Sequence, residues 1–379
     1  MRKKILIVGA GFAGAVHARV LAECGYSVDL IDRRNHIGGN AYDYTDENGI
    51  RVHAYGPHLF HTKNSKIIDW LSRFGNLVPY EHKVRALLPS GQTAPLPINL
   101  DTLNIVFDSN LNSPTEAAEF LGRLSVPLAA PRSAAEYLYS KIGRELTDLF
   151  FRPYTKKMWG FDLEEMSAAV VKRIPLNFDR VDTYFYKDEI QVLPQSGYTV
   201  LFESMLDHPS IRVHLSVMFA HDMLNDYSFC FNSMPIDEFY QYQFGDLPYR
   251  SIKFHSRTEL ATTGNTEPSW SVTNFTDLGP YTRETAWHIL PYHLVSETGK
   301  RTFTREEPCD YKDNNFERYY PVKTADERYQ KIYQQYHQLS CSQEKSISFI
   351  GRCGTYQYLD MDQVINQSLA NVNVWLAQQ

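Results

Sequence analysis

The first forty residues combine an apolar run, a glycine-rich turn, a helical pattern and a second apolar run. Residues 4–8 read Lys-Ile-Leu-Ile-Val, a short β-branched run typical of a buried parallel strand. Gly-Ala-Gly-Phe-Ala-Gly follows at 9–14 and opens a helical pattern of apolar residues. A second strand-like run at 28–31 ends on Asp32. This order predicts a dinucleotide-binding βαβ unit.

The individual residues of this unit match the demands of a dinucleotide. Gly9 permits a tight turn, Gly11 lets the backbone approach a pyrophosphate, and Gly14 lets the helix pack on the strand. The free N–H groups and the dipole at the helix N-terminus favour a phosphate, and Asp32 is placed to accept from a ribose hydroxyl. We therefore expect Gly9, Gly11, Phe12, Gly14 and Asp32 to contact the dinucleotide.

The segment after the second strand narrows the choice of dinucleotide. Polar residues from Arg33 lead to a diglycine at 38–39, which resembles the N-terminal signature of FAD-dependent amine oxidases and their relatives. NAD-binding domains usually lack this extension, although an ordinary glycine turn would also account for it. The segment predicts FAD as the cofactor, with Arg33, Gly39 and Asn40 among its contacts.

Composition excludes several classes of function. A formal net charge of −6 and a pI near 6.1 argue against a nucleic-acid or anionic-membrane surface. No run approaches 18 apolar residues, so we expect no membrane span, and we also expect no signal peptide. The five cysteines are scattered without CxxC or metal-ligand spacing. This favours reduced thiols in a cytoplasmic protein without a metal site.

The pattern along the chain predicts a discontinuous α/β fold (α+β overall). Residues 1–80, 190–243 and 325–379 share a rhythm of short strands and helices, which predicts a Rossmann-like FAD-binding domain in three pieces. Residues 81–170 are mainly helical and predict a substrate and nucleotide domain. Residues 171–189 and 244–324 are rich in strand patterns and predict an antiparallel β-sheet domain.

Seven sequence blocks in a fixed order resemble the UDP-galactopyranose mutase family, in its prokaryotic form. These blocks are AYGPHLFHT (54–62), PYTKKMWG (153–160), KRIP (172–175), NFTD (274–277), PYTR (280–283), YYPV (319–322) and YQYLDM (356–361). The resemblance covers most of the chain and is weakest over 81–135. It implies an isomerase that interconverts UDP-galactopyranose and UDP-galactofuranose for cell-surface polysaccharide.

The resemblance also implies the chemistry and the partners. FAD is active only when reduced, and its N5 forms an adduct with the sugar while the diphosphate leaves and returns. The partners implied are a nucleotide-sugar substrate and NAD(P)H or another reductant, and a homodimer is possible.

By the same resemblance, Arg173, Arg283 and His58 are the catalytic residues. A guanidinium stays charged and binds phosphate oxygens in a bidentate manner, which suits the two arginines to the diphosphate. His58 would lie beside the flavin, and Arg352 and Asp360 would also contact FAD. The residues implied for substrate binding are Phe150, Tyr154, Thr155, Trp159, Tyr184, Asn274, Tyr319, Tyr358 and Asp360.

Structural roles compete with some of these assignments, and other functions stay open. The arginines could form surface ion pairs, Trp159 could belong to a core, and Asp360 could be a helix N-cap. A related mutase could act on dTDP-fucopyranose or UDP-N-acetylgalactosamine. An FAD-dependent oxidase or desaturase would share the first forty residues and Gly351-Arg352. A non-catalytic nucleotide-sugar or flavin-binding protein would also retain the aromatic residues.

Overall fold

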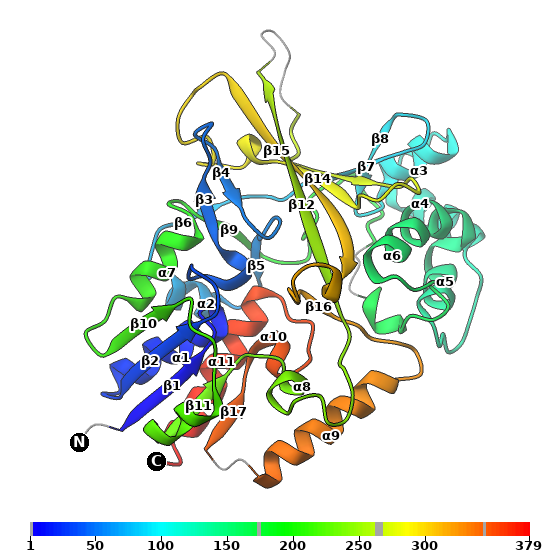
Figure 1. Cartoon of the computed structure of the whole chain (residues 1–379). Coiled ribbons are helices and arrows are strands. Elements are labelled where there is room, and N and C mark those ends of the chain that lie inside the picture. The colour runs from blue at the N-terminus through cyan, green and yellow to red at the C-terminus, as the bar shows by residue number, and fades with distance from the viewer. Residues whose placement is uncertain (1–2, 173–175, 262–267, 344–345) are drawn as a thin grey trace.

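The computed structural model describes residues 3–172, 176–261, 268–343 and 346–379. Figure 1 shows a sheet flanked by helices, a second sheet with two long strands, and a group of helices beside that second sheet. The predicted mixed α/β class with a Rossmann-like unit and an antiparallel sheet is confirmed.

The first sheet has five strands in the order β10-β2-β1-β11-β17, and every neighbouring pair is parallel. Its strands are β1 (Lys4–Val8), β2 (Ser27–Asp32), β10 (Ile211–Leu215), β11 (Phe229–Asn232) and β17 (Ile347–Phe349). The helices α1 (Phe12–Glu23), α7 (Tyr198–Leu206) and α11 (Met361–Leu376) share its main apolar core.

The alternation of side chains along β1 explains why this sheet is covered on both faces. Ile5 and Ile7 belong to the core shared with α1, α7 and α11, whereas Leu6 and Val8 belong to a smaller core on the other face. All four side chains are nearly or fully buried. A continuous apolar run is therefore what this strand requires.

The second sheet has seven strands in the order β16-β12-β15-β14-β13-β7-β8. They are β7 (Val84–Leu87), β8 (Thr93–Leu96), β12 (Tyr249–Leu260), β13 (Val272–Phe275), β14 (Arg283–Ala286), β15 (Lys300–Asp310) and β16 (Tyr320–Pro321). The pairings are antiparallel except that of β13 with β7, which is parallel.

Four helices pack beside this sheet, on the right of Figure 1: α3 (Leu100–Phe107), α4 (Pro114–Leu124), α5 (Ala134–Leu146) and α6 (Arg152–Trp159). Their core includes Ala86 and Ala94 of β7 and β8. Ser113 and Ser133 cap α4 and α5, each accepting a backbone N–H three residues on. A π-helical turn over Thr147–Phe151 leads directly into α6.

The α-helices and β-strands not yet named include one long helix and several short segments. They are β3 (Asp43–Thr45), β4 (Arg51–His53), β5 (Phe60–Thr62), α2 (Ser65–Leu71), β6 (Leu77–Pro79), β9 (Ile190–Pro194), α8 (Ile236–Phe239), α9 (Arg328–Gln343) and α10 (Gly351–Gly354). Strands β5, β9 and β6 form a small antiparallel sheet, and β3 pairs with β4.

The expectation of strands over 171–189 was wrong, because the described residues of this segment form only one isolated bridge, from Thr183 to Lys83. Side chains hold it as a loop: Asp179 Oδ1 accepts from Asn177 Nδ2 and from the Val181 backbone N–H, both at 2.7 Å. Such local bonds compete with strand pairing. Residues 81–170 also contribute β7 and β8 to the second sheet. The three-part division of the chain into domains stays a prediction.

Candidate functional site

A cavity of about 270 Å³ lies at the carboxyl ends of β1, β2 and β11, where ligands bind in open α/β sheets. We call it the glycine-lined cavity. The predicted cofactor residues that line it are Gly9, Gly11, Phe12, Asp32, Arg33, Gly39, Asn40, His58 and Arg352. Gly14 and Asp360 are not among its lining residues.

The glycines in and beside this cavity are each required for a different steric reason. Gly9 has φ +101°, a conformation that favours glycine. A Cβ on Gly39 would lie 2.8 Å from the Gly11 Cα, so these two turns approach each other by backbone alone. Gly14 does not face the cavity, since a Cβ there would lie 1.9 Å from the Gly9 carbonyl oxygen. Its role is the close packing of α1 on β1.

The polar groups of the glycine-lined cavity fit a dinucleotide. Asp32 accepts the backbone N–H of Ala10 at 2.7 Å and that of Arg34 at 2.8 Å, which fixes its carboxylate at the end of β2. Gly11 is the N-cap of α1. Because glycine has no side chain, it provides no side-chain acceptor for the first N–H groups of the helix. The residues present therefore fit the FAD that the sequence predicts.

A second cavity of about 510 Å³ lies between α6 and the seven-stranded sheet. We call it the aromatic cavity. Besides His58 and Arg352, nine of the predicted residues line it: Phe150, Tyr154, Thr155, Trp159, Tyr184, Asn274, Arg283, Tyr358 and Asp360. The two cavities share His58, Arg352 and Met361 as lining residues, so these three residues border both cavities.

Arg283 is a partly buried cation that lines the aromatic cavity. It faces Asn274 across the β13–β14 hairpin and Glu306 across the β14–β15 pair. Its Nε lies 2.8 Å from Glu306 Oε1, close enough for a charge pair although the N–H is not aligned as a hydrogen bond. Burial opposes its charge, but the Glu306 carboxylate, Tyr154 and Tyr320 together outweigh burial and raise the pKa of Arg283. The guanidinium is thus held charged where an anion can reach it.

Tyrosines form another part of the lining of the aromatic cavity. The rings of Tyr320 and Tyr358 stack at 5.3 Å, and the Arg352 guanidinium lies 5.2 Å from the Tyr358 ring. Burial raises the pKa of Tyr320 to about 12, and burial also raises the pKa of Tyr154. Both phenols therefore keep their protons near neutral pH and can donate hydrogen bonds to phosphate oxygens.

His58 sits between the two cavities as a neutral imidazole. Its Nδ1 donates to the Gly56 carbonyl at 2.8 Å, which leaves Nε2 as the acceptor nitrogen. Burial lowers the pKa of His58 to about 4, with the Arg352 and Arg283 charges acting in the same direction. Its backbone N–H donates to Nδ1 of the buried His53 at 3.0 Å, so a second imidazole holds this turn.

Three predicted positions need separate comment. Arg173 lies outside the described residues. Tyr319 does not line the aromatic cavity; Tyr320 does, because successive side chains of an extended segment point to opposite sides. Asp360 lines the cavity and also precedes α11 as its N-cap, with its backbone N–H donating to Gln363 Oε1 at 2.9 Å. The N-cap role of Asp360 is confirmed, and its contact with a ligand stays a prediction.

Two polar groups that the sequence analysis did not assign belong to this site. Glu306 is 1% exposed and lies against Gly56 as well as Arg283. His61, which belongs to the sequence block at 54–62, lines the aromatic cavity, and its Nδ1 lies 2.6 Å from Asp188 Oδ2. Glu306 is distant in sequence from Gly56, and His61 is distant from Asp188. The only sequence signal for His61 was its place in the motif GPHLFH.

The buried histidines predict a loss of stability in mild acid. Burial lowers the pKa of His82 and of His293 to about 3 and that of His53 well below its usual value. Between pH 6.5 and the folded pKa the unfolded chain binds the proton and the folded chain does not. Each such histidine then lowers the free energy of unfolding by at most ~1.4 kcal/mol per pH unit as pH falls.

We therefore expect urea unfolding to show a lower free energy of unfolding at pH 5 than at pH 7. The free energy of unfolding of His82→Phe should fall less over this interval, because the variant lacks one of the groups that bind a proton on unfolding. Phenylalanine suits this position because the His82 Nδ1 has no hydrogen-bond partner in the described part of the chain. Equal losses in the wild type and in this variant would contradict the assignment.

Over the described residues, no group of three or more His, Cys, Asp or Glu side chains is arranged to hold a metal ion. No helix in the same residues has the length and apolar character needed to cross a membrane.

Comparison with known sequences points to one family. Residues 149–358 match the family model described as UDP-galactopyranose mutase, and residues 7–74 match an NAD(P)-binding Rossmann-like domain. The chain is 38% identical to a probable UDP-galactopyranose mutase of Klebsiella pneumoniae, covering 99% of this chain and 95% of that protein. It is 37% identical to a dTDP-fucopyranose mutase of Escherichia coli, covering 98% of each.

Solved structures agree at the level of the fold. A crystal structure of reduced UDP-galactopyranose mutase superposes with a TM-score of 0.74 at 18% identity, covering 100% of this chain and 96% of that one. In contrast, an FAD-dependent oxidoreductase of Emericella nidulans is 37% identical over only 19% of this chain. That match is far shorter than those to the mutases.

Proposed function

The chain belongs to the UDP-galactopyranose mutase family, an FAD-dependent family of isomerases, and we propose that it interconverts UDP-galactopyranose and UDP-galactofuranose. The observation that carries this proposal is the pair of cavities that share His58, Arg352 and Met361. Reduced FAD, when bound in the glycine-lined cavity, supplies the nucleophile for the reaction at the anomeric carbon. The chain's own residues bind, orient and enclose the substrate.

Each wall of the aromatic cavity matches one part of a nucleotide sugar. Phe150, Tyr154 and Trp159 offer apolar and ring surfaces for a pyrimidine. Arg283, with its charge secured by Glu306, binds the diphosphate both before and after its bond to the sugar breaks. We propose the same role for Arg173. Asn274 has a buried Oδ1 with no partner within the described residues, and it accepts from a sugar hydroxyl.

The neutral state of His58 suits a position beside the cofactor. Because Nδ1 carries the proton that Gly56 accepts, Nε2 can accept a hydrogen bond from a group lying between the two cavities. A protonated His58 would also be repelled by the charges of Arg283 and Arg352, which both act to lower its pKa.

The experiment that tests this function is a product assay on the FAD-loaded protein. We expect furanose product from UDP-galactopyranose after reduction with dithionite and none from the oxidised protein in air. Equal activity of the oxidised protein would contradict the requirement for reduced FAD. Formation of an oxidised sugar or amine product, without furanose, would favour an oxidase.

A second candidate substrate is dTDP-fucopyranose, because a dTDP-fucopyranose mutase is 37% identical over nearly the whole chain. The ring surfaces of the aromatic cavity accept either pyrimidine. A panel of UDP- and dTDP-hexoses, UDP-N-acetylgalactosamine included, distinguishes them by kcat/KM. NAD(P)H as the reductant, a homodimer and a cytoplasmic location remain further proposals, the last of them supported by the five free cysteines.

A further inference from the structure

Lys157 connects α6 to the β13–β14 hairpin through three backbone carbonyls. Its Nζ donates to the oxygens of Tyr281 at 2.7 Å and of Phe275 and Asp277 at 3.0 Å, and Asp277 Oδ1 lies at 3.3 Å. The side chain is only 10% exposed. An ammonium has three N–H donors, so the three carbonyls use all of them. A surface lysine would not be held in this way.

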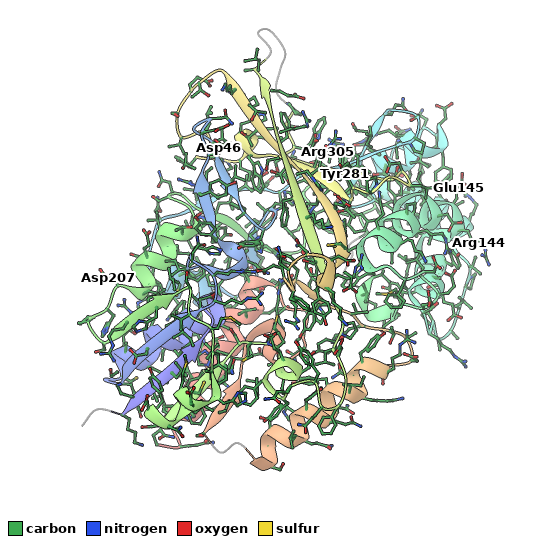
Figure 2. The ribbon with its side chains drawn as sticks, in the orientation of Figure 1. Asp46, Arg144, Glu145, Asp207, Tyr281 and Arg305 are labelled. Carbon is green, nitrogen blue, oxygen red and sulfur yellow. The ribbon has the colours of Figure 1, made fainter. Side chains whose placement is uncertain are left out.

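The contacted carbonyls belong to the turn that joins two residues of the aromatic cavity. Asn274 of β13 pairs with Arg283 of β14, and residues 276–282 form the turn beyond them. Lys157 holds this turn at both ends, through Phe275 and Tyr281. On the other side, the Arg305 guanidinium of β15 lies 5.5 Å from the Tyr281 ring, and Figure 2 shows the two labelled residues close together.

The helix that carries Lys157 supplies the opposite wall of the cavity. Tyr154, Met158 and Trp159 of α6 line the aromatic cavity, whereas Lys157 is not among its lining residues. The end of the helix is tied to β12, because Arg250 donates to the carbonyls of Met158 at 2.8 Å and Lys157 at 3.2 Å. The backbone of α6 is therefore fixed at the residue from which the Lys157 side chain extends.

We propose that Lys157 is a positioning residue that sets the spacing between the aromatic wall of α6 and the hairpin that carries Asn274 and Arg283. With the spacing held, one nucleoside diphosphate contacts the helix through its base and the hairpin through its phosphates. This inference rests on the proposed function for the identity of the ligand. We call the attachment of α6 to the hairpin through Lys157 the clamp. The clamp rests only on the contacts of Lys157, whatever the ligand is.

The test compares K157M with K156M in the FAD-loaded, oxidised protein. Lys156 is the adjacent lysine, 53% exposed, and its Nζ contacts Asp162 on the surface at 3.0 Å. We expect calorimetry to show UDP binding about tenfold weaker in K157M, roughly the loss of one charge-assisted contact, and unchanged in K156M. For turnover we expect a larger rise in KM than fall in kcat, with partial recovery in K157R.

A second measurement on the same variants does not depend on any ligand. Hydrogen exchange of the amides over 276–282 should be faster in K157M than in the wild type and unchanged in K156M. If the exchange is faster but UDP binds as in the wild type, the positioning role is overturned. Unchanged exchange in K157M would overturn the clamp itself.

The two proposals can fail separately. A wild type that does not bind UDP, together with faster exchange in K157M, would overturn the proposed substrate and leave the clamp supported. If K157M does not retain FAD, K157Q takes its place, because its amide keeps two donors in the buried position. Wild-type affinity for UDP in K157Q, together with faster exchange over 276–282 in that variant, would then overturn the positioning role.

Discussion

Replacing Arg283 with Ala should lower kcat/KM by between about tenfold and about a hundred and fifty fold, the value of one charge-assisted contact of ~1.5–3 kcal/mol. The fall in kcat should exceed the rise in KM, because the guanidinium also stabilises the charge that develops on the departing diphosphate. FAD content and the flavin spectrum should stay normal, since Arg283 lines only the aromatic cavity. Steady-state kinetics with dithionite-reduced protein measures both constants.

The buried partner of Arg283 provides an internal control. R283A leaves the Glu306 carboxylate, 1% exposed, without its cation, which should cost ~3–5 kcal/mol of stability. The double variant R283M/E306M removes both charges and should recover stability but not turnover. Arg257 belongs to the same sheet and lies 2.8 Å from Glu284 outside both cavities, so R257A should keep near-normal turnover.

We expect R173A to behave like R283A in turnover, following the role proposed for Arg173. Lysine at either position should restore activity only in part, because an ammonium keeps the charge and loses the planar fork. Near-normal turnover in both alanine variants, with FAD bound, would show that the diphosphate binds elsewhere. Loss of FAD in both would make them cofactor or structural residues and favour an oxidase.

Replacing Gly14 with Ala should remove most of the bound FAD and destabilise the fold. A Cβ at this position would lie 1.9 Å from the Gly9 carbonyl oxygen and 3.1 Å from Ile7 Cγ2. The helix α1 must therefore move away from β1, which we expect to cost ~1–3 kcal/mol as an overpacked contact. Because the start of α1 and the turn before it line the glycine-lined cavity, FAD retention should fall together with stability.

Gly122 in α4 is the matched control for this substitution. It is also a helical glycine, but nothing lies within 4 Å of the Cβ that alanine would add. G122A should therefore keep its FAD and gain up to ~1 kcal/mol of stability from helix propensity. Flavin absorbance per chain and thermal unfolding measure the two effects. Full FAD content in G14A would contradict the close packing described for α1.

The sequence alone determined those features that depend on neighbouring residues. The run at 4–8, the glycines at 9, 11 and 14 and Asp32 specify a strand, a turn and a helix start within 32 residues, and the structure has all of them in the expected order. Phe150 and Tyr154 are four residues apart, and both line the aromatic cavity, although a π-helical turn precedes α6. Periodicity and backbone conformation are local properties, so they can be inferred from a short window.

Only the tertiary structure decided which side chains meet across the chain. It selected Tyr320 rather than Tyr319 for the aromatic cavity, and it paired Arg283 with Glu306 across two strands. It also brought Lys157 to carbonyls 118 to 124 residues away. Such contacts depend on strand register and on the packing of separate elements, and shifting a strand by one residue reverses every side chain along it. The residue types that bind a nucleotide sugar are visible in the sequence, but their spacing is a property of the folded molecule.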